Sequence, residues 1–157
     1  MNTLKIYAKK LAVSLALPIS VGILAAILIR DGVSAFGGMP QPPLSPPAAL
    51  FPVVWTILYL LMGVAAYLVW TQPKRSPAAA ALYLAQLAVN FVWPLLFFNA
   101  GADGAALVCI AVLWLLVLAV TLVFFNLNRT AGLLMLPYLV WVTFAAVLNY
   151  GVWMLNR

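Results

Sequence analysis

Residues 105–125 read AALVCIAVLWLLVLAVTLVFF, an uninterrupted apolar stretch without a single charged side chain. A helix needs about 20 such residues to cross the hydrocarbon core of a bilayer. Four more apolar runs of similar length occur in the chain. Together the runs predict spanning helices over residues 11–30, 47–71, 77–99, 104–126 and 130–155. The sequence therefore predicts an all-α membrane protein, a five-transmembrane-helix bundle that forms one domain over residues 1–157.

The composition agrees with burial in lipid. Of the 157 residues, 68% are hydrophobic and only 6% are charged, whereas a soluble domain carries roughly 25% charged residues. The first apolar run, residues 11–29, is longer than the roughly 7–15 apolar residues of a signal peptide. We therefore expect this run to remain as a helix, with a kink at Pro18.

Residues 30–47 differ from the rest of the chain because they hold three glycines and five prolines. Proline interrupts helices and favours extended geometry in the residue before it. We expect a long loop here, and loops of this length are commonly functional. The other connections are short, so the second to fifth helices are expected to run antiparallel to their sequence neighbours.

The basic residues predict how the chain is oriented. The net charge is +6, and the basic residues fall at the ends of the apolar runs rather than in a basic tract, which argues against nucleic acid as a partner. One side of the predicted bundle carries only Arg30 and Arg157. The positive-inside rule predicts a cytoplasmic N-terminus, with the first loop and the C-terminus outside, in a bacterial cell membrane. The other side carries Lys5, Lys9, Lys10, Lys74, Arg75 and Arg129.

The residue types that catalyse most reactions are scarce. The chain has no histidine, a single cysteine, Cys109, and two acidic residues, Asp31 and Asp103, both in expected loops. Neither an acid/base pair nor a metal-binding cluster can be built from these residues. The sequence predicts no metal ion and no required cofactor, and it favours a protein that is not an enzyme.

Polar and aromatic side chains recur on one face of three predicted helices. Buried polar groups are costly in hydrocarbon unless they have partners, so their positions carry information. We expect the three faces to surround one cavity that suits a large, flat, apolar ligand. The alternative is that the aromatic residues anchor the helices at the membrane surface and the amides bond neighbouring helices. The faces consist of Trp55 and Tyr59; of Tyr83, Gln86, Asn90 and Trp93; and of Tyr138, Trp141, Ala145 and Asn149.

The third predicted helix also carries a stripe of alanines. Small residues at helical spacing let two helices approach closely. Such a stripe could form a dimer interface or pack against another helix of the same bundle. The sequence does not decide between these two interpretations. The alanines are Ala78, Ala81, Ala85 and Ala88.

Four motifs on the second, third and fifth helices resemble one known family. They are PPAALFPVVWTILY at residues 46–59, QLAVNFVW at 86–93, PYLVW at 137–141 and VLNYGVW at 147–153. In this order they are similar to the TspO/MBR family of tryptophan-rich sensory proteins, which includes the mitochondrial translocator protein. The resemblance covers the chain from about residue 43 to its end.

The resemblance implies a receptor or transporter-like membrane protein, often a homodimer. Its ligands would be porphyrins, such as protoporphyrin IX or haem-related tetrapyrroles, and other flat hydrophobic molecules. They would bind in a pocket capped by the first loop. Transferred by motif, the pocket would contain Trp55, Asn90, Trp141 and Ala145, with Pro46, Pro47, Phe51 and Tyr59 at its mouth and wall.

Two departures from the family pattern bear on function. Leu44 and Ser45 stand where many members carry tryptophans that are linked to light-dependent porphyrin breakdown. A porphyrin-degrading enzyme is therefore kept only as an alternative function. A second alternative is a membrane scaffold that modulates a partner complex. Six residues separate Tyr150 from Arg157, more than the loose sterol-binding pattern allows. Specific sterol binding is therefore not predicted, and a lipid or sterol stays an alternative ligand.

Overall fold

The structure is a computed structural model that describes residues 2–74 and 76–157. Arg75, one of the basic residues used above to predict orientation, lies outside the described residues. The described residues are helical throughout, apart from turns and loops, and contain no strand. The elements are α1 (Asn2–Leu28), α2 (Arg30–Phe36), α3 (Leu50–Trp70), α4 (Pro77–Pro94), η1 (Leu95–Asn99), α5 (Asp103–Leu127) and α6 (Arg129–Leu155).

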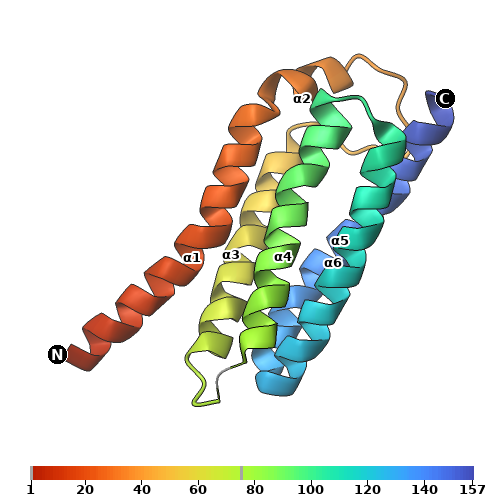
Figure 1. Cartoon of the computed structure of the whole chain (residues 1–157). Helices are drawn as coiled ribbons and strands as arrows, with labels where there is room; N and C mark the ends of the chain where they lie inside the picture. The colour runs from red at the N-terminus through yellow and green to blue at the C-terminus, as the bar shows by residue number, and fades with distance from the viewer. Residues whose placement is uncertain (1, 75) are drawn as a thin grey trace.

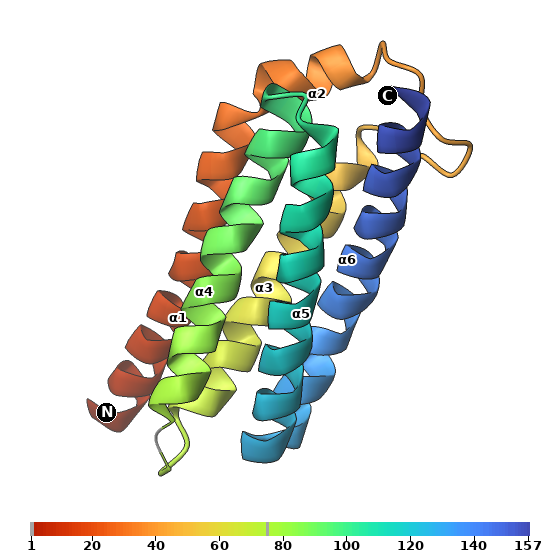
Figure 2. The same ribbon diagram turned by 45° about the vertical axis from the view of Figure 1, so that its right-hand side comes forward.

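The long helices run alternately up and down in one bundle, as Figures 1 and 2 show from two sides. α1 lies against α3 at the edge of the bundle, while α4, α5 and α6 complete it. The short α2 crosses the end of the bundle that also holds the C-terminus, and the N-terminus lies at the opposite end. The predicted five-helix membrane bundle is thus confirmed.

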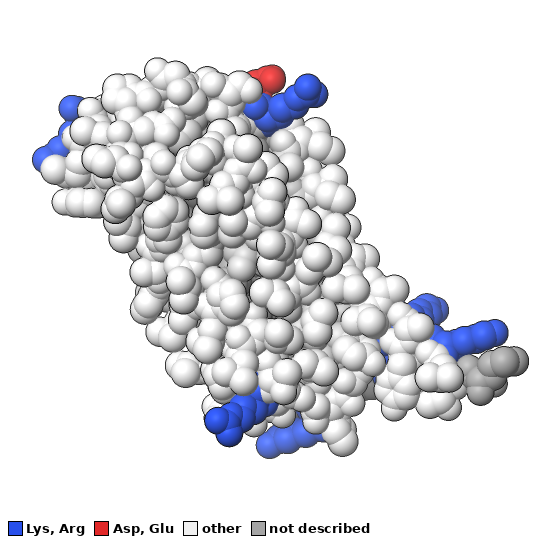
Figure 3. Space-filling model, turned by 180° about the vertical axis from the view of Figure 1, so that it is seen from behind, with Lys and Arg blue, Asp and Glu red and all other residues white. Residues whose placement is uncertain are grey.

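Five helices are long and apolar enough to cross a membrane. Figure 3 shows, on one face, a wide band without charged side chains between two ends that carry Lys and Arg. Because a band of this kind can only be solvated by lipid, the chain is an integral membrane protein. The five candidate spans are Thr3–Leu28, Leu50–Trp70, Pro77–Asn99, Asp103–Leu127 and Arg129–Leu155.

Local sequence signals fix the starts of two spans. α4 begins with Pro77 at its first position, where a missing N–H costs nothing, and the Ser76 hydroxyl accepts a hydrogen bond of 3.2 Å from the Ala79 N–H. α6 begins after Asn128, whose side-chain oxygen accepts from the Ala131 N–H at 3.0 Å. Each cap satisfies a free backbone donor and allows a tight turn between antiparallel helices.

The predicted first loop contains a helix that the prolines gave no reason to expect. Residues 30–36 hold no proline, so the chain continues as α2, which ends at Phe36 before the Pro-rich segment starts at Pro40. Phe36 is buried, with its ring centroid 5.3 Å from that of Phe97 and 5.4 Å from that of Phe98. α2 is therefore packed on the upper end of the α4–η1 helix, and only the segment after it is a loop.

The upper end of α4 widens into the π-helical turn η1. After Pro94, the Ala100 N–H bonds to the Leu95 carbonyl at 3.0 Å, five residues back. The Asn99 side chain donates a 2.8 Å hydrogen bond to the Leu28 carbonyl at the end of α1. Such turns are frequent at functional sites, and this one places Phe98 against α1 and α2.

Packing inside the bundle separates the alternatives for the alanine stripe. α1 meets α3 closely at Gly63, where an added Cβ would lie 2.9 Å from the Leu15 Cα. The alanines of α4, in contrast, all face outward and are exposed, so packing within the bundle does not explain them. They are Ala78, Ala81, Ala85 and Ala88.

Candidate functional site

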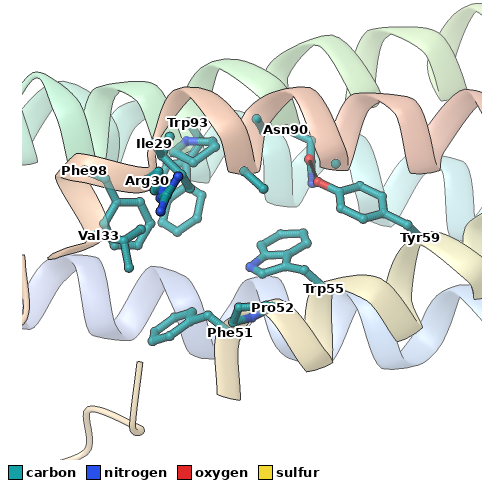
Figure 4. Close-up of a pocket in the computed structure, with 14 residues that line it drawn as sticks. Ile29, Arg30, Val33, Phe51, Pro52, Trp55, Tyr59, Asn90, Trp93 and Phe98 are labelled. Atoms are coloured by element: carbon teal, nitrogen blue, oxygen red, sulfur yellow. Dashed lines mark hydrogen bonds between the residues drawn. The ribbon is translucent and has the colours of Figure 1, made fainter. Parts of the chain in front are cut away.

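A cavity of about 280 Å³ lies between α1, α3 and α4, beneath the start of α2. Figure 4 shows it with Arg30 and Phe98 towards one end and Tyr59 towards the other. Its lining is almost wholly apolar and aromatic, with Asn90, Tyr59 and Arg30 as the polar residues. The remaining lining residues are Gly22, Ala25, Ala26, Ile29, Val33, Phe51, Pro52, Trp55, Trp93 and Pro94.

Aromatic rings form the wall on the α3 and α4 side. The ring of Trp55 stacks on Tyr59 with centroids 5.7 Å apart, and it lies 6.4 Å from the ring of Trp93. Trp93 in turn stacks on Phe97 at 5.3 Å. Rings held at these separations support one another, so the wall offers large, preformed apolar surfaces to a flat molecule.

Small residues of α1 form the opposite wall, which the sequence interpretation missed. Gly22, Ala25 and Ala26 follow one another at i, i+3 and i+4, a spacing that was available in the sequence, and Ile29, just after α1, continues the same face at i+7. A Cβ at Gly22 would collide with the ring of Tyr59. The absence of side-chain bulk on this face of α1 leaves the space that the aromatic wall encloses.

A chain of hydrogen bonds closes the deep end of the cavity. The Tyr59 hydroxyl donates to Asn90 Oδ1 at 2.6 Å, Asn90 Nδ2 donates to the Tyr138 hydroxyl at 2.7 Å, and that hydroxyl donates to Gln86 Oε1 at 2.9 Å. All four side chains are buried. Because the groups satisfy one another in a low-dielectric interior, they tie α3, α4 and α6 together without solvent.

A second chain of bonds lies nearer α2. Trp93 Nε1 donates to Asn149 Oδ1 at 3.0 Å, and Asn149 Nδ2 donates to the Asp103 backbone carbonyl at 3.0 Å. These bonds fix the Trp93 indole on α4 through contacts with α6 and the first turn of α5. Trp93 therefore presents one rigid face to the cavity.

The cavity does not lie where the sequence predicted it, between the second, third and fifth spans. Gln86, Asn90 and Tyr138, which were expected to line the predicted hollow, bond to one another, and the cavity lies instead next to α1. Phe51, Trp55, Tyr59, Asn90 and Trp93 line it as expected. The predicted site residues that line neither this cavity nor its neighbour are Gln86, Tyr138, Trp141, Ala145 and Asn149.

Trp141 lies near the site without lining it. Its ring is 6.0 Å from that of Phe51 and 5.3 Å from that of Phe144. Its indole N–H is buried without a hydrogen-bond partner. Trp141 thus supports Phe51, which belongs to the cavity wall, from the α6 side.

A second cavity, of about 380 Å³, lies under the Pro-rich loop. Pro46 and Pro47 line it, and it shares Val33, Phe51 and Phe98 with the first cavity. The Ser45 hydroxyl, which also lines it, is buried without a partner. The two cavities therefore adjoin, and the loop forms the roof of the outer one.

The site carries little reactive chemistry. Among residues 2–74 and 76–157, no group of three or more His, Cys, Asp or Glu side chains could hold a metal ion. What the geometry offers is shape, aromatic surface and a few hydrogen-bonding groups, which are the features of a binding site for hydrophobic small molecules.

The fold and the site together define a five-span membrane protein with an aromatic-walled cavity beneath α2 and the Pro-rich loop. A family model for the TspO/MBR family matches residues 14–154, and the chain belongs to this family.

The chain is 35% identical to the tryptophan-rich protein TspO of Archaeoglobus fulgidus over 158 residues, which cover 99% of each chain. It is 41% identical to a tryptophan-rich sensory protein of Cereibacter sphaeroides over 121 residues, 77% of this chain and 76% of the relative. It is 35% identical to the human translocator protein over 131 residues, 81% of this chain and 78% of the relative.

Proposed function

We propose that the protein is a membrane receptor, of the sensor or transporter kind, for flat hydrophobic molecules. The proposed ligand class is the tetrapyrroles, with protoporphyrin IX as the representative. The observation that carries the proposal is the cavity between α1, α3 and α4, where the rigid rings of Trp55 and Trp93 face small residues of α1. The relatives named as a sensory protein and a translocator protein support the same kind of role.

The sizes of the cavities decide how a large ligand would lie. Ligand pockets typically enclose about 300–1,000 Å³, and the inner cavity alone, at about 280 Å³, falls just short of that range. The outer cavity of about 380 Å³ adjoins it past Phe51. A macrocycle would therefore extend from Trp55 outward beneath the Pro-rich loop, and the loop would act as its lid.

The binding energy would come mainly from apolar burial and stacking. Asn90 and Tyr59 already bond to each other, so they shape the deep end more than they attract a polar ligand. Stacked aromatic contacts contribute about 0.5–1.5 kcal/mol each beyond area burial. The two indoles and Phe51 would therefore supply most of the contact energy that distinguishes a flat aromatic ligand from lipid.

A cavity-filling substitution tests the proposal. Ala25 is buried and lines the cavity, whereas Ala16, on the same helix, is exposed. We expect Ala25→Phe to weaken protoporphyrin IX binding at least about tenfold, because a ring there occupies the ligand's space. Ala16→Phe is the matched control and should leave binding unchanged.

Binding is measured by quenching of tryptophan fluorescence in detergent at fixed protein concentration. Saturable quenching in the wild type and in Ala16→Phe, with loss in Ala25→Phe, is the expected result. Equal binding by all three proteins would overturn the assignment of the cavity. Absence of saturable binding in the wild type would overturn the receptor function itself and favour the scaffold alternative.

A further inference from the structure

Arg30 is the charged residue among those that line the inner cavity. It is the first residue of α2, at the point where α1 has ended and the chain turns across the top of the bundle. Figure 4 places its guanidinium next to Phe98 and Val33, towards the end of the cavity opposite Tyr59. The cavity is thus apolar through its middle, with a cation at one end.

The guanidinium of Arg30 has no anionic partner among residues 2–74 and 76–157. The chain has only two acidic residues, Asp31 and Asp103, and no ion pair forms within the described parts of the chain. Asp31 follows Arg30 directly on α2, and adjacent residues of a helix do not face each other. Five N–H donors of a permanently charged group therefore remain available to a ligand.

The other end of the cavity is neutral and its polar groups are already engaged. Asn90 accepts a hydrogen bond from Tyr59 and donates one to Tyr138. A ligand's anionic group would gain little there and would lose its hydration. The two ends of the cavity therefore differ, and the difference favours one orientation of an amphiphilic ligand.

We propose that Arg30 selects ligands with a carboxylate and holds that carboxylate at the α2 end of the cavity. This rests on the proposed function and narrows its ligand class to anionic amphiphiles, whose apolar body lies between Trp55 and the small residues of α1. A guanidinium binds a carboxylate through two parallel N–H···O bonds. Arg30 is exposed, so solvent screens the pair and its contribution to binding is modest.

The test compares two probes that differ only in charge: protoporphyrin IX, with two carboxylates, and its dimethyl ester. We expect the wild type to bind the acid about fivefold more tightly than the ester, the upper end of what a partly exposed ion pair contributes. Arg30→Gln should abolish this preference, because it weakens binding of the acid about fivefold more than binding of the ester. Binding is followed by quenching of tryptophan fluorescence in a non-ionic detergent. For a given probe, the amount taken up by the detergent micelles is then the same in every variant's titration.

Two further variants sharpen the test. Arg157→Gln removes the other cation of the same side of the bundle, which contacts Trp153 rather than the cavity, and should keep the wild-type preference. Arg30→Lys keeps the charge without the planar fork, so we expect an intermediate preference.

The possible outcomes separate the two proposals. An acid-to-ester ratio that is the same in the wild type and in Arg30→Gln would overturn the role of Arg30 and leave the receptor function standing. A ratio that falls equally in Arg157→Gln would also overturn it, because net charge rather than position would then be responsible. Failure of both probes to bind saturably would overturn both proposals.

Discussion

At the residue scale, Asn90 is the side chain on which most of the site's geometry depends. It joins Tyr59 of α3 to Tyr138 of α6 through one accepted and one donated hydrogen bond. We expect Asn90→Ala to lower the free energy of unfolding by about 1–3 kcal/mol, because it leaves two buried phenols short of a partner. Thermal unfolding in detergent measures this, with the exposed Asn126→Ala as control. Equal melting temperatures in the two variants would contradict the network's importance.

Gly22 provides a second test at the same scale. An added methyl group must displace the Tyr59 ring, which is stacked on Trp55 and bonded to Asn90. Gly22→Ala should therefore weaken protoporphyrin binding several-fold and lower the melting temperature. Gly38→Ala is the control, since Gly38 lines neither cavity and its Cβ would make only an ordinary contact at 3.6 Å. A Gly22→Ala protein with wild-type binding would show that the two walls are not held as closely as described.

Individual site residues were only partly predictable from the sequence. Spacing placed Trp55, Asn90 and Trp93 on inward faces correctly, because polar and aromatic groups in a lipid-facing chain must turn inward or to an interface. The same rule could not tell that Gln86 and Tyr138 would bond to each other rather than line the cavity. Which polar groups remain available depends on side-chain distances across helices, which periodicity does not contain.

At the scale of elements, α2 and the loop after it form the roof of the site. Phe36 holds α2 on η1 through its contacts with Phe97 and Phe98. We expect Phe36→Ala to loosen this roof, so that limited proteolysis of the first loop becomes faster and the ligand dissociates faster. Met39→Ala, at an exposed position, should change neither rate. Unchanged proteolysis in Phe36→Ala would show that the loop is held by other contacts.

The elements themselves followed from the sequence more completely than the site did. Five long apolar runs predict five spans because unpaired backbone groups are excluded from lipid. α2 escaped prediction since seven residues without proline are too few to identify a helix from propensity alone. The contribution of α1 to the cavity escaped for a different reason, because small residues such as Ala25 also occur wherever helices simply pack.

For the whole molecule, the charge asymmetry leads to a proposal about orientation. We propose that the end with the N-terminus faces the cytoplasm and that α2 and the Pro-rich loop face outward. In a Cys109→Ser background, Leu44→Cys should react with a membrane-impermeant maleimide on intact cells. Gln72→Cys, in the turn between α3 and α4, should react only after permeabilisation. The reverse pattern would contradict the proposed orientation.

The alanine stripe of α4 is exposed and is left unused by packing inside the bundle. We propose that it is the interface through which two copies of the protein form a dimer. Ala85→Phe would hold two such faces apart. We expect it to shift the detergent-solubilised protein from dimer to monomer in size-exclusion chromatography with light scattering, while the lipid-facing Ala16→Phe leaves the mass unchanged. An Ala85→Phe protein that stays dimeric would exclude this face as the interface.

The central claim is that a flat hydrophobic ligand lies between α1, α3 and α4, and indole NMR tests it most directly. A porphyrin ring strongly shifts only the signals of groups beside it. With ¹⁵N-tryptophan labelling and added protoporphyrin IX, the account predicts saturable shifts of the Trp55 and Trp93 indole N–H signals. Trp70 and Trp114, outside the cavity, should barely move. Shifts confined to Trp114, in the lipid-facing groove between α5 and α6, with Trp55 and Trp93 unmoved, would contradict the account.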